Sequence, residues 1–72
     1  MDEKLFTTKI REILDNESAT MDSVLADIEE WDSLSIVSFV AFANSSCGKK
    51  LAPALIRECK TIRDLYNLLV GE

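Results

Sequence analysis

The fold of this chain is decided by residues 32–48, which read DSLSIVSFVAFANSSCG. Asp32 is a good N-cap because its carboxylate can accept hydrogen bonds from the first free amides of a helix. Gly48 is suited to end the helix, since glycine adopts the left-handed conformation without a steric penalty. The residues between them are apolar on many sides and carry no charge. The stretch therefore predicts a helix that starts at Ser33, stops at Gly48 and lies at the centre of the fold.

Upstream of this helix, apolar residues recur at helical spacing, with charged residues on the intervening face. They are Phe6, Ile10, Ile13 and Leu14. The pattern predicts a first amphipathic helix of about three turns that ends near residues 15–16. The connection that follows, residues 16–31, is acidic, turn-rich and longer than most loops. Its apolar residues are predicted to pin it to the bundle, with a short helix around residues 21–28: Met21, Val24, Leu25, Ile28 and Trp31.

Downstream, two local signals predict two more helices. Pro53 suits the first turn of a short third helix that carries Leu55 and Ile56. Thr61 and Asp64 form a variant of the capping box that opens a fourth helix. Its apolar face consists of Ile62, Leu65, Tyr66 and Leu69. With no alternating β pattern, the sequence predicts an all-α fold, a small four-helix bundle, and residues 1–72 are too few to build a second domain.

The charge of the chain is unevenly placed and excludes several classes of partner. The formal net charge is -5, and no Lys or Arg occurs between Glu12 and Gly48. Such a field repels nucleic acid and anionic membranes, and it favours a protein partner with a positive patch. The N-terminus lacks the basic start and apolar run of a secretory signal, so we expect a cytoplasmic protein. In that compartment Cys47 and Cys59 are expected to be free, buried thiols, and the alternative from sequence is one disulfide between them.

The residue types present leave little room for catalysis. The chain has no histidine, so the usual base of a Ser-His or Cys-His site is missing. Two cysteines alone make a poor zinc site, and two glycines provide no phosphate-binding loop. We expect neither an enzyme nor a metal site. The remaining candidate for chemistry is Ser33, because the negative charge of a phosphodiester on its hydroxyl would lie at the positive end of the helix dipole.

Four features occur in one order: WDSL at residues 31–34, an apolar helix after it, Gly48 followed by Leu51, and TIRDLY at residues 61–66. Together, over nearly the whole chain, they resemble the acyl carrier protein family, which includes peptidyl and D-alanyl carrier relatives. The resemblance implies a bundle of acyl-carrier type, with three longer helices, a short third helix and a long loop between the first two.

The resemblance also implies a function for Ser33. This serine would be the attachment point of 4'-phosphopantetheine, which a separate phosphopantetheinyl transferase takes from coenzyme A. The distal thiol would hold acyl or aminoacyl groups as thioesters for acyl-loading, synthase and transferase enzymes of fatty acid, polyketide, nonribosomal peptide or related biosynthesis. Asp32 and Leu34 would be read by the transferase, and Trp31 would pack the loop onto the second helix. Such a carrier is expected to be a monomer that catalyses nothing by itself.

Two features need weighing against this interpretation. Ser23 lies in Asp22-Ser23-Val24-Leu25, which partly imitates the motif, but no long helix follows it. Fatty-acid carriers usually bear acids along the second helix, whereas Ser35 and Ser38 stand two and five positions after Ser33. We therefore expect partner proteins to contact apolar side chains, namely Leu34, Ile36 and Phe39, together with the third helix. Acids of the loop are expected to steer the partners by charge; they are Asp27, Glu29 and Glu30.

Two other classes of function remain open from the residues. The chain can be an unmodified helical interaction module, or a small acidic regulator that binds a basic enzyme surface. In both cases Ser33 would be an ordinary residue next to an N-cap. The identity of the cargo is not encoded in any motif of the chain.

Overall fold

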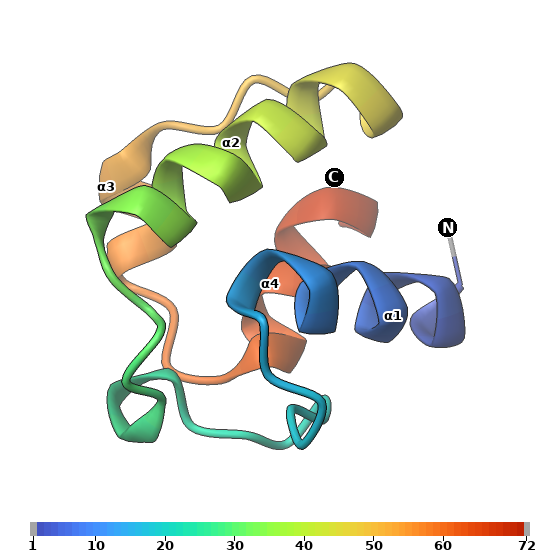
Figure 1. The fold of residues 1–72 in the computed structure, drawn as a ribbon. Helices are drawn as coiled ribbons and strands as arrows, with labels where there is room; N and C mark the ends of the chain where they lie inside the picture. The colour runs from blue at the N-terminus through green and yellow to red at the C-terminus, as the bar shows by residue number, and fades with distance from the viewer. Residues whose placement is uncertain (1, 72) are drawn as a thin grey trace.

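The computed structural model describes residues 2–71, which fold into four helices joined by loops (Figure 1). The helices are α1 (Glu3–Leu14), α2 (Ser33–Cys47), α3 (Pro53–Arg57) and α4 (Ile62–Val70), and a 3-10 turn, η1 (Leu25–Asp27), lies in the loop between α1 and α2. Within residues 2–71 no strand forms, although Val24 and Thr61 make one isolated antiparallel bridge. The prediction of a small all-α four-helix fold is confirmed.

The ends of α2 are the predicted caps. The Asp32 carboxylate accepts a hydrogen bond from the Ser35 amide at 3.1 Å, which satisfies one of the free donors of the first turn. Gly48 follows the last turn with a φ of 64°, and its amide donates to the Asn44 carbonyl at 3.1 Å. A side chain at this φ would be strained, so glycine sets the end of the helix.

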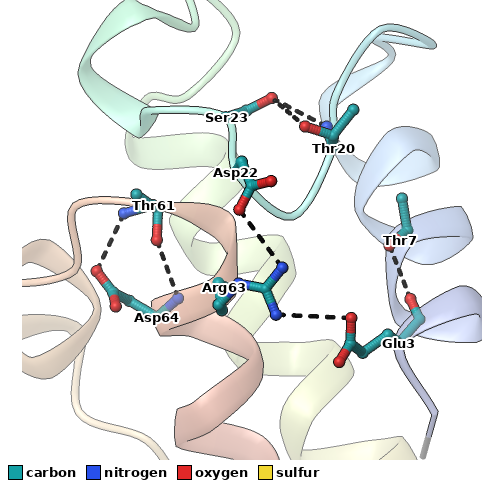
Figure 2. Close-up of polar contacts among 8 residues, drawn as sticks. All are labelled: Glu3, Thr7, Thr20, Asp22, Ser23, Thr61, Arg63 and Asp64. Atoms are coloured by element: carbon teal, nitrogen blue, oxygen red, sulfur yellow. Dashed lines mark hydrogen bonds and ion pairs between the residues drawn. The ribbon is translucent and has the colours of Figure 1, made fainter.

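The other helices also begin or end at residues that the sequence marks. Asp15 caps the end of α1 with a left-handed φ of 51°, and Pro53 opens α3. α4 opens with the capping box: Thr61 Oγ1 accepts from the Asp64 amide at 3.3 Å, and the Asp64 carboxylate accepts from the Thr61 amide at 3.1 Å (Figure 2). These local contacts are independent of the rest of the fold, which is why the sequence predicts them.

The core lies where α1, α2 and α4 meet. The Phe6 ring packs edge-on against Phe39, with centroids 6.1 Å apart at 88°, and against Tyr66 at 5.2 Å. The three helices bury Phe6, Ile10 and Leu14 from α1, Ile36, Phe39 and Ala43 from α2, and Ile62, Leu65 and Leu69 from α4. The short α3 adds Ile56 to this core. The apolar faces predicted for the first and fourth helices are confirmed, with Tyr66 partly buried.

The loop between α1 and α2 is joined to the segment around the start of α4 by main-chain hydrogen bonds. They join Leu25 N to Lys60 O (2.8 Å), Ile62 N to Ser23 O (3.1 Å) and Arg63 N to Met21 O (2.8 Å). In Figure 1 the loop passes below α4 before it rises to the start of α2. This pairing gives the long connection a fixed course over the bundle.

Four of the five predicted anchors of this loop pack against the core. Met21 and Leu25 are buried, and Ile28 and Trp31 are partly buried against the same cluster. The prediction for Val24 is wrong, because its side chain is 43% exposed. Val24 pairs with Thr61 in extended conformation, and alternation along extended chain sends its side chain outward while Leu25 turns inward.

Arg63 joins three parts of the chain near the surface. Its guanidinium lies 3.6 Å from the Glu3 carboxylate of α1 and 3.4 Å from the Asp22 carboxylate of the loop (Figure 2). Earlier in the same loop, the Ala19 carbonyl accepts a hydrogen bond from Arg11 Nε of α1 at 2.8 Å. The loop that leads to Ser33 is thus held by side chains as well as by main chain.

Candidate functional site

Ser33 is the first residue of α2 and its side chain is exposed. Its hydroxyl has no hydrogen-bond partner within residues 2–71. The first hydrogen bond of the helix runs from Ile36 N to Asp32 O at 3.0 Å, so the amides before Ile36 have no acceptor within the helix. Of these, the amides of Ser33 and Leu34 have no other acceptor within residues 2–71. A free hydroxyl therefore stands beside two free amides at the positive end of a long helix.

The residues on either side of Ser33 are also accessible. Asp32 is exposed, although one of its carboxylate oxygens is occupied by the Ser35 amide. Leu34 is 76% exposed, which is unusual for a side chain of its size. A modifying enzyme can reach all three residues of the motif without any movement of the chain.

The apolar surface next to Ser33 differs from the predicted one. Phe39 is 0% and Ile36 8% exposed, so the prediction that these two contact a partner is wrong. Both belong to the core, since they face Phe6 and its neighbours. The exposed large apolar residues of α2 are Leu34 and Val37, and Val37 is 64% exposed.

The third helix lies beside the same region. α3 packs against α2, and Figure 1 shows it beside the beginning of α2. Its Leu55 is 46% exposed. We call Leu34, Val37 and Leu55 the apolar face; Leu34 and Val37 are three residues apart and so lie on one side of α2.

The acids predicted to steer partners lie on the surface of the loop. Asp27, Glu29 and Glu30 are all exposed. The Glu30 carboxylate accepts a hydrogen bond from the Asn16 amide group at 3.3 Å, so its position is partly fixed. These three carboxylates and Asp32 precede a helix that carries no charge from Ser33 to Cys47. Negative potential therefore comes from the loop and not from α2.

Ser23, the competing serine, lies in a different environment. It is partly buried, and its hydroxyl accepts from the Thr20 amide at 2.9 Å and lies 3.3 Å from Thr20 Oγ1 (Figure 2). The hydroxyl is thus engaged in a local turn. No long helix begins after Ser23, since the 3-10 turn η1 covers only Leu25–Asp27.

The cysteines are free but less buried than predicted. Cys47 and Cys59 are both half-buried and unpaired with each other. Cys47 ends α2 beside a surface hollow that Leu5 and Val70 also line, away from Ser33. Burial, and then the negative charges of Asp64 and Glu58, raise the pKa of the Cys59 thiol. A raised pKa lowers the thiolate fraction, so Cys59 is a poor nucleophile.

Residues 2–71 contain neither a metal-binding cluster nor a helix that could span a membrane. No three His, Cys, Asp or Glu side chains gather there in an arrangement that could hold a metal ion. Every helix in this range is too short or too polar to cross a membrane. The free hydroxyl of Ser33 is the feature with the clearest chemical use.

No family model, no curated protein and no solved structure matches this chain.

Proposed function

We propose that this chain is a carrier protein of acyl carrier type, which receives 4'-phosphopantetheine on Ser33. The observation that carries the proposal is the free, exposed Ser33 hydroxyl at the first position of α2, inside the WDSL motif. A nucleophilic oxygen must be reachable by a transferase, and this one needs no rearrangement to be reached. The partly buried and hydrogen-bonded Ser23 offers no such oxygen.

The residues around Ser33 suit a phosphodiester. The Ser33 oxygen would form a bond to phosphorus as the pyrophosphate bond of coenzyme A breaks, the hydroxyl proton passing to the transferase and adenosine 3',5'-bisphosphate leaving. The free amides of Ser33 and Leu34 and the dipole of the fifteen-residue α2 would then favour the negative charge on the attached phosphate. The group ends in a thiol, which supplies the site where acyl groups are held as thioesters.

The remaining parts of the surface suit a carrier that visits several enzymes. Leu34 and Val37 of the apolar face follow the attachment point within about one turn of α2, where partner enzymes would dock, and Leu55 lies on α3, which packs against α2. Exposed apolar side chains that gather on one part of the surface favour contacts with other proteins. The acids at 27–30 attract basic partner surfaces, so the chain would act as a monomeric cytoplasmic protein with acyl-loading, synthase and transferase partners.

The test is intact mass spectrometry after incubation with coenzyme A, Mg²⁺ and a phosphopantetheinyl transferase of broad carrier specificity. The native chain and the Ser23→Ala variant are expected to gain one phosphopantetheine unit, and the Ser33→Ala variant is expected to gain none. A folded native chain that gains no mass would exclude the carrier function and favour an unmodified interaction module. Modification that persists in Ser33→Ala would place the site elsewhere.

A further inference from the structure

Ser35 is the one polar side chain within residues 2–71 that is buried, at 7% exposure. It lies in the first turn of α2, two residues after Ser33, and shares the inward side of the helix with Phe39 four residues later. Polar groups in protein interiors are nearly always hydrogen-bonded. The hydrogen-bond partner of Ser35 therefore shows which part of the chain this side chain holds.

Ser35 is tied at two points to the chain that precedes Ser33. Its hydroxyl donates a hydrogen bond to the Glu30 carbonyl, and its amide donates to the Asp32 carboxylate at 3.1 Å. Ser33 lies between Asp32 and Ser35 and takes part in neither contact. The end of the loop is thus folded back onto the helix around the serine that we propose is modified.

The hydroxyl contact sets the direction in which the chain enters α2. The Trp31 amide, directly after Glu30, donates to the Ile28 carbonyl at 3.1 Å, so the turn before the helix is continuous with this contact. If the Ser35 hydroxyl is removed, the Glu30 carbonyl needs another donor and is drawn toward water. The path from Glu30 to Asp32 then loses its attachment to the helix.

We propose that Ser35 is a positioning residue for the modification of Ser33. Its hydroxyl fixes the approach from Glu30 to Asp32 and so holds the Ser33 hydroxyl toward the transferase. This inference rests on the proposed carrier function. Ser35 is too buried to be touched by the transferase, so its effect passes through the course of the chain around Ser33.

The chain offers a matched control in Ser38. This serine lies one turn later on the same helix and is exposed. Both serines occupy positions where fatty-acid carriers usually bear acids, yet only Ser35 faces the interior. Replacing either by alanine removes the same atoms, and the two variants differ in whether the contact to Glu30 is lost.

The experiment compares steady-state phosphopantetheine transfer to the native chain, Ser35→Ala, Ser35→Thr and Ser38→Ala, using coenzyme A and the same transferase. For Ser35→Ala we expect kcat/KM to fall about fivefold through a rise in the KM for the carrier, which corresponds to the loss of one hydrogen bond. Ser35→Thr keeps the hydroxyl and is expected to recover most of the loss. Ser38→Ala is expected to match the native chain.

Amide hydrogen exchange provides the second measurement, and circular dichroism checks that each variant is folded. In Ser35→Ala the amides of Trp31 and Ile36 are expected to exchange faster, while amides of α4 keep the native rate. Native values of kcat/KM in Ser35→Ala, or a loss that Ser35→Thr does not recover, would overturn the inference while leaving the carrier function intact. A native chain that is never modified would instead refute the proposed function.

Discussion

The Asp64 carboxylate accepts hydrogen bonds from the amides of Lys60 and Thr61, at 2.9 and 3.1 Å, while the Thr61 hydroxyl accepts from the Asp64 amide. The amide of Lys60, and then that of Thr61, hold the pKa of the Asp64 carboxyl below its ordinary value. The capping box therefore links the stability of α4 to pH.

The first prediction concerns acid. Because the folded carboxyl binds a proton less readily than the unfolded one, unfolding takes up a proton as the pH falls. The contribution of Asp64 is fully present above the ordinary carboxyl pKa of about 4 and is lost as the pH falls through the lowered pKa. Urea unfolding at a series of pH values should show a shallower acid loss for Asp64→Asn than for the native chain. Parallel curves would contradict this linkage.

The second prediction concerns Arg63, whose ion pairs with Glu3 and Asp22 are at the surface. Exposed pairs contribute little, so Arg63→Gln should lower the free energy of unfolding by less than about 1 kcal/mol at low salt. The difference should shrink at high salt because the charges are screened. Arg57→Gln is the control, since no ion pair of Arg57 occurs within residues 2–71. A salt-independent loss in Arg63→Gln would point to a packing role.

The third prediction compares two apolar residues of α2. Phe39→Ala removes a fully buried ring that packs against Phe6 and should cost about 3–5 kcal/mol, enough to unfold much of so small a domain. Val37→Ala changes an exposed side chain and should alter the free energy of unfolding by less than about 0.5 kcal/mol. Thermal and urea unfolding measure both. Equal losses would mean that α2 presents a different face to the core.

The fourth prediction separates the steering of a partner by the loop acids from its docking on the apolar face. The partner used is the phosphopantetheinyl transferase that we propose modifies Ser33. Glu29→Lys should lower the association rate about threefold at low salt, with the difference fading as salt rises, because it acts through long-range charge. Glu17→Lys makes the same change elsewhere in the loop and should have less effect. Stopped-flow association measures both variants. Unchanged rates and salt dependence in Glu29→Lys would remove the steering role.

Val37→Ala tests the docking half of the same prediction. It should weaken transferase binding at every salt concentration, because an apolar contact is not screened. Its dissociation rate should rise while its association rate stays near the native value. Binding equal to that of the native chain would exclude Val37 from the contact.

The helix boundaries could be predicted from sequence because they depend on neighbours in the chain. Asp32, Gly48, Pro53 and the pair Thr61–Asp64 act on amides and carbonyls within a few residues, so their effect does not wait for the tertiary fold. The pairing of Val24 with Thr61 joins residues far apart in sequence, and nothing local indicates it. This is why the sequence wrongly predicts that Val24 faces inward.

The faces of α2 could not be assigned from sequence for a different reason. The helix is apolar on many sides, so periodicity does not distinguish the side that faces the core from the side that faces solvent. Sequence alone therefore predicts partner contacts for Ile36 and Phe39, which the fold buries, and does not distinguish the buried Ser35 from the exposed Ser38. The place of Ser33 at the helix start is predicted from sequence, but the contact of Ser35 with Glu30 depends on the three-dimensional course of the loop.

Three of the hydrogen bonds that join the loop to the segment around the start of α4 use main-chain atoms alone, with the amides of Leu25, Ile62 and Arg63 as donors. Proline is the substitution that removes such a donor, whereas other residues keep it. Exposed side chains of the loop that make no polar contact of their own within residues 2–71, such as Asp27 and Glu29, can therefore be replaced while these main-chain hydrogen bonds persist, so the charge and shape of the surface ahead of Ser33 can change without loss of the fold. A fold of this kind can acquire new partners through substitutions of exposed residues alone.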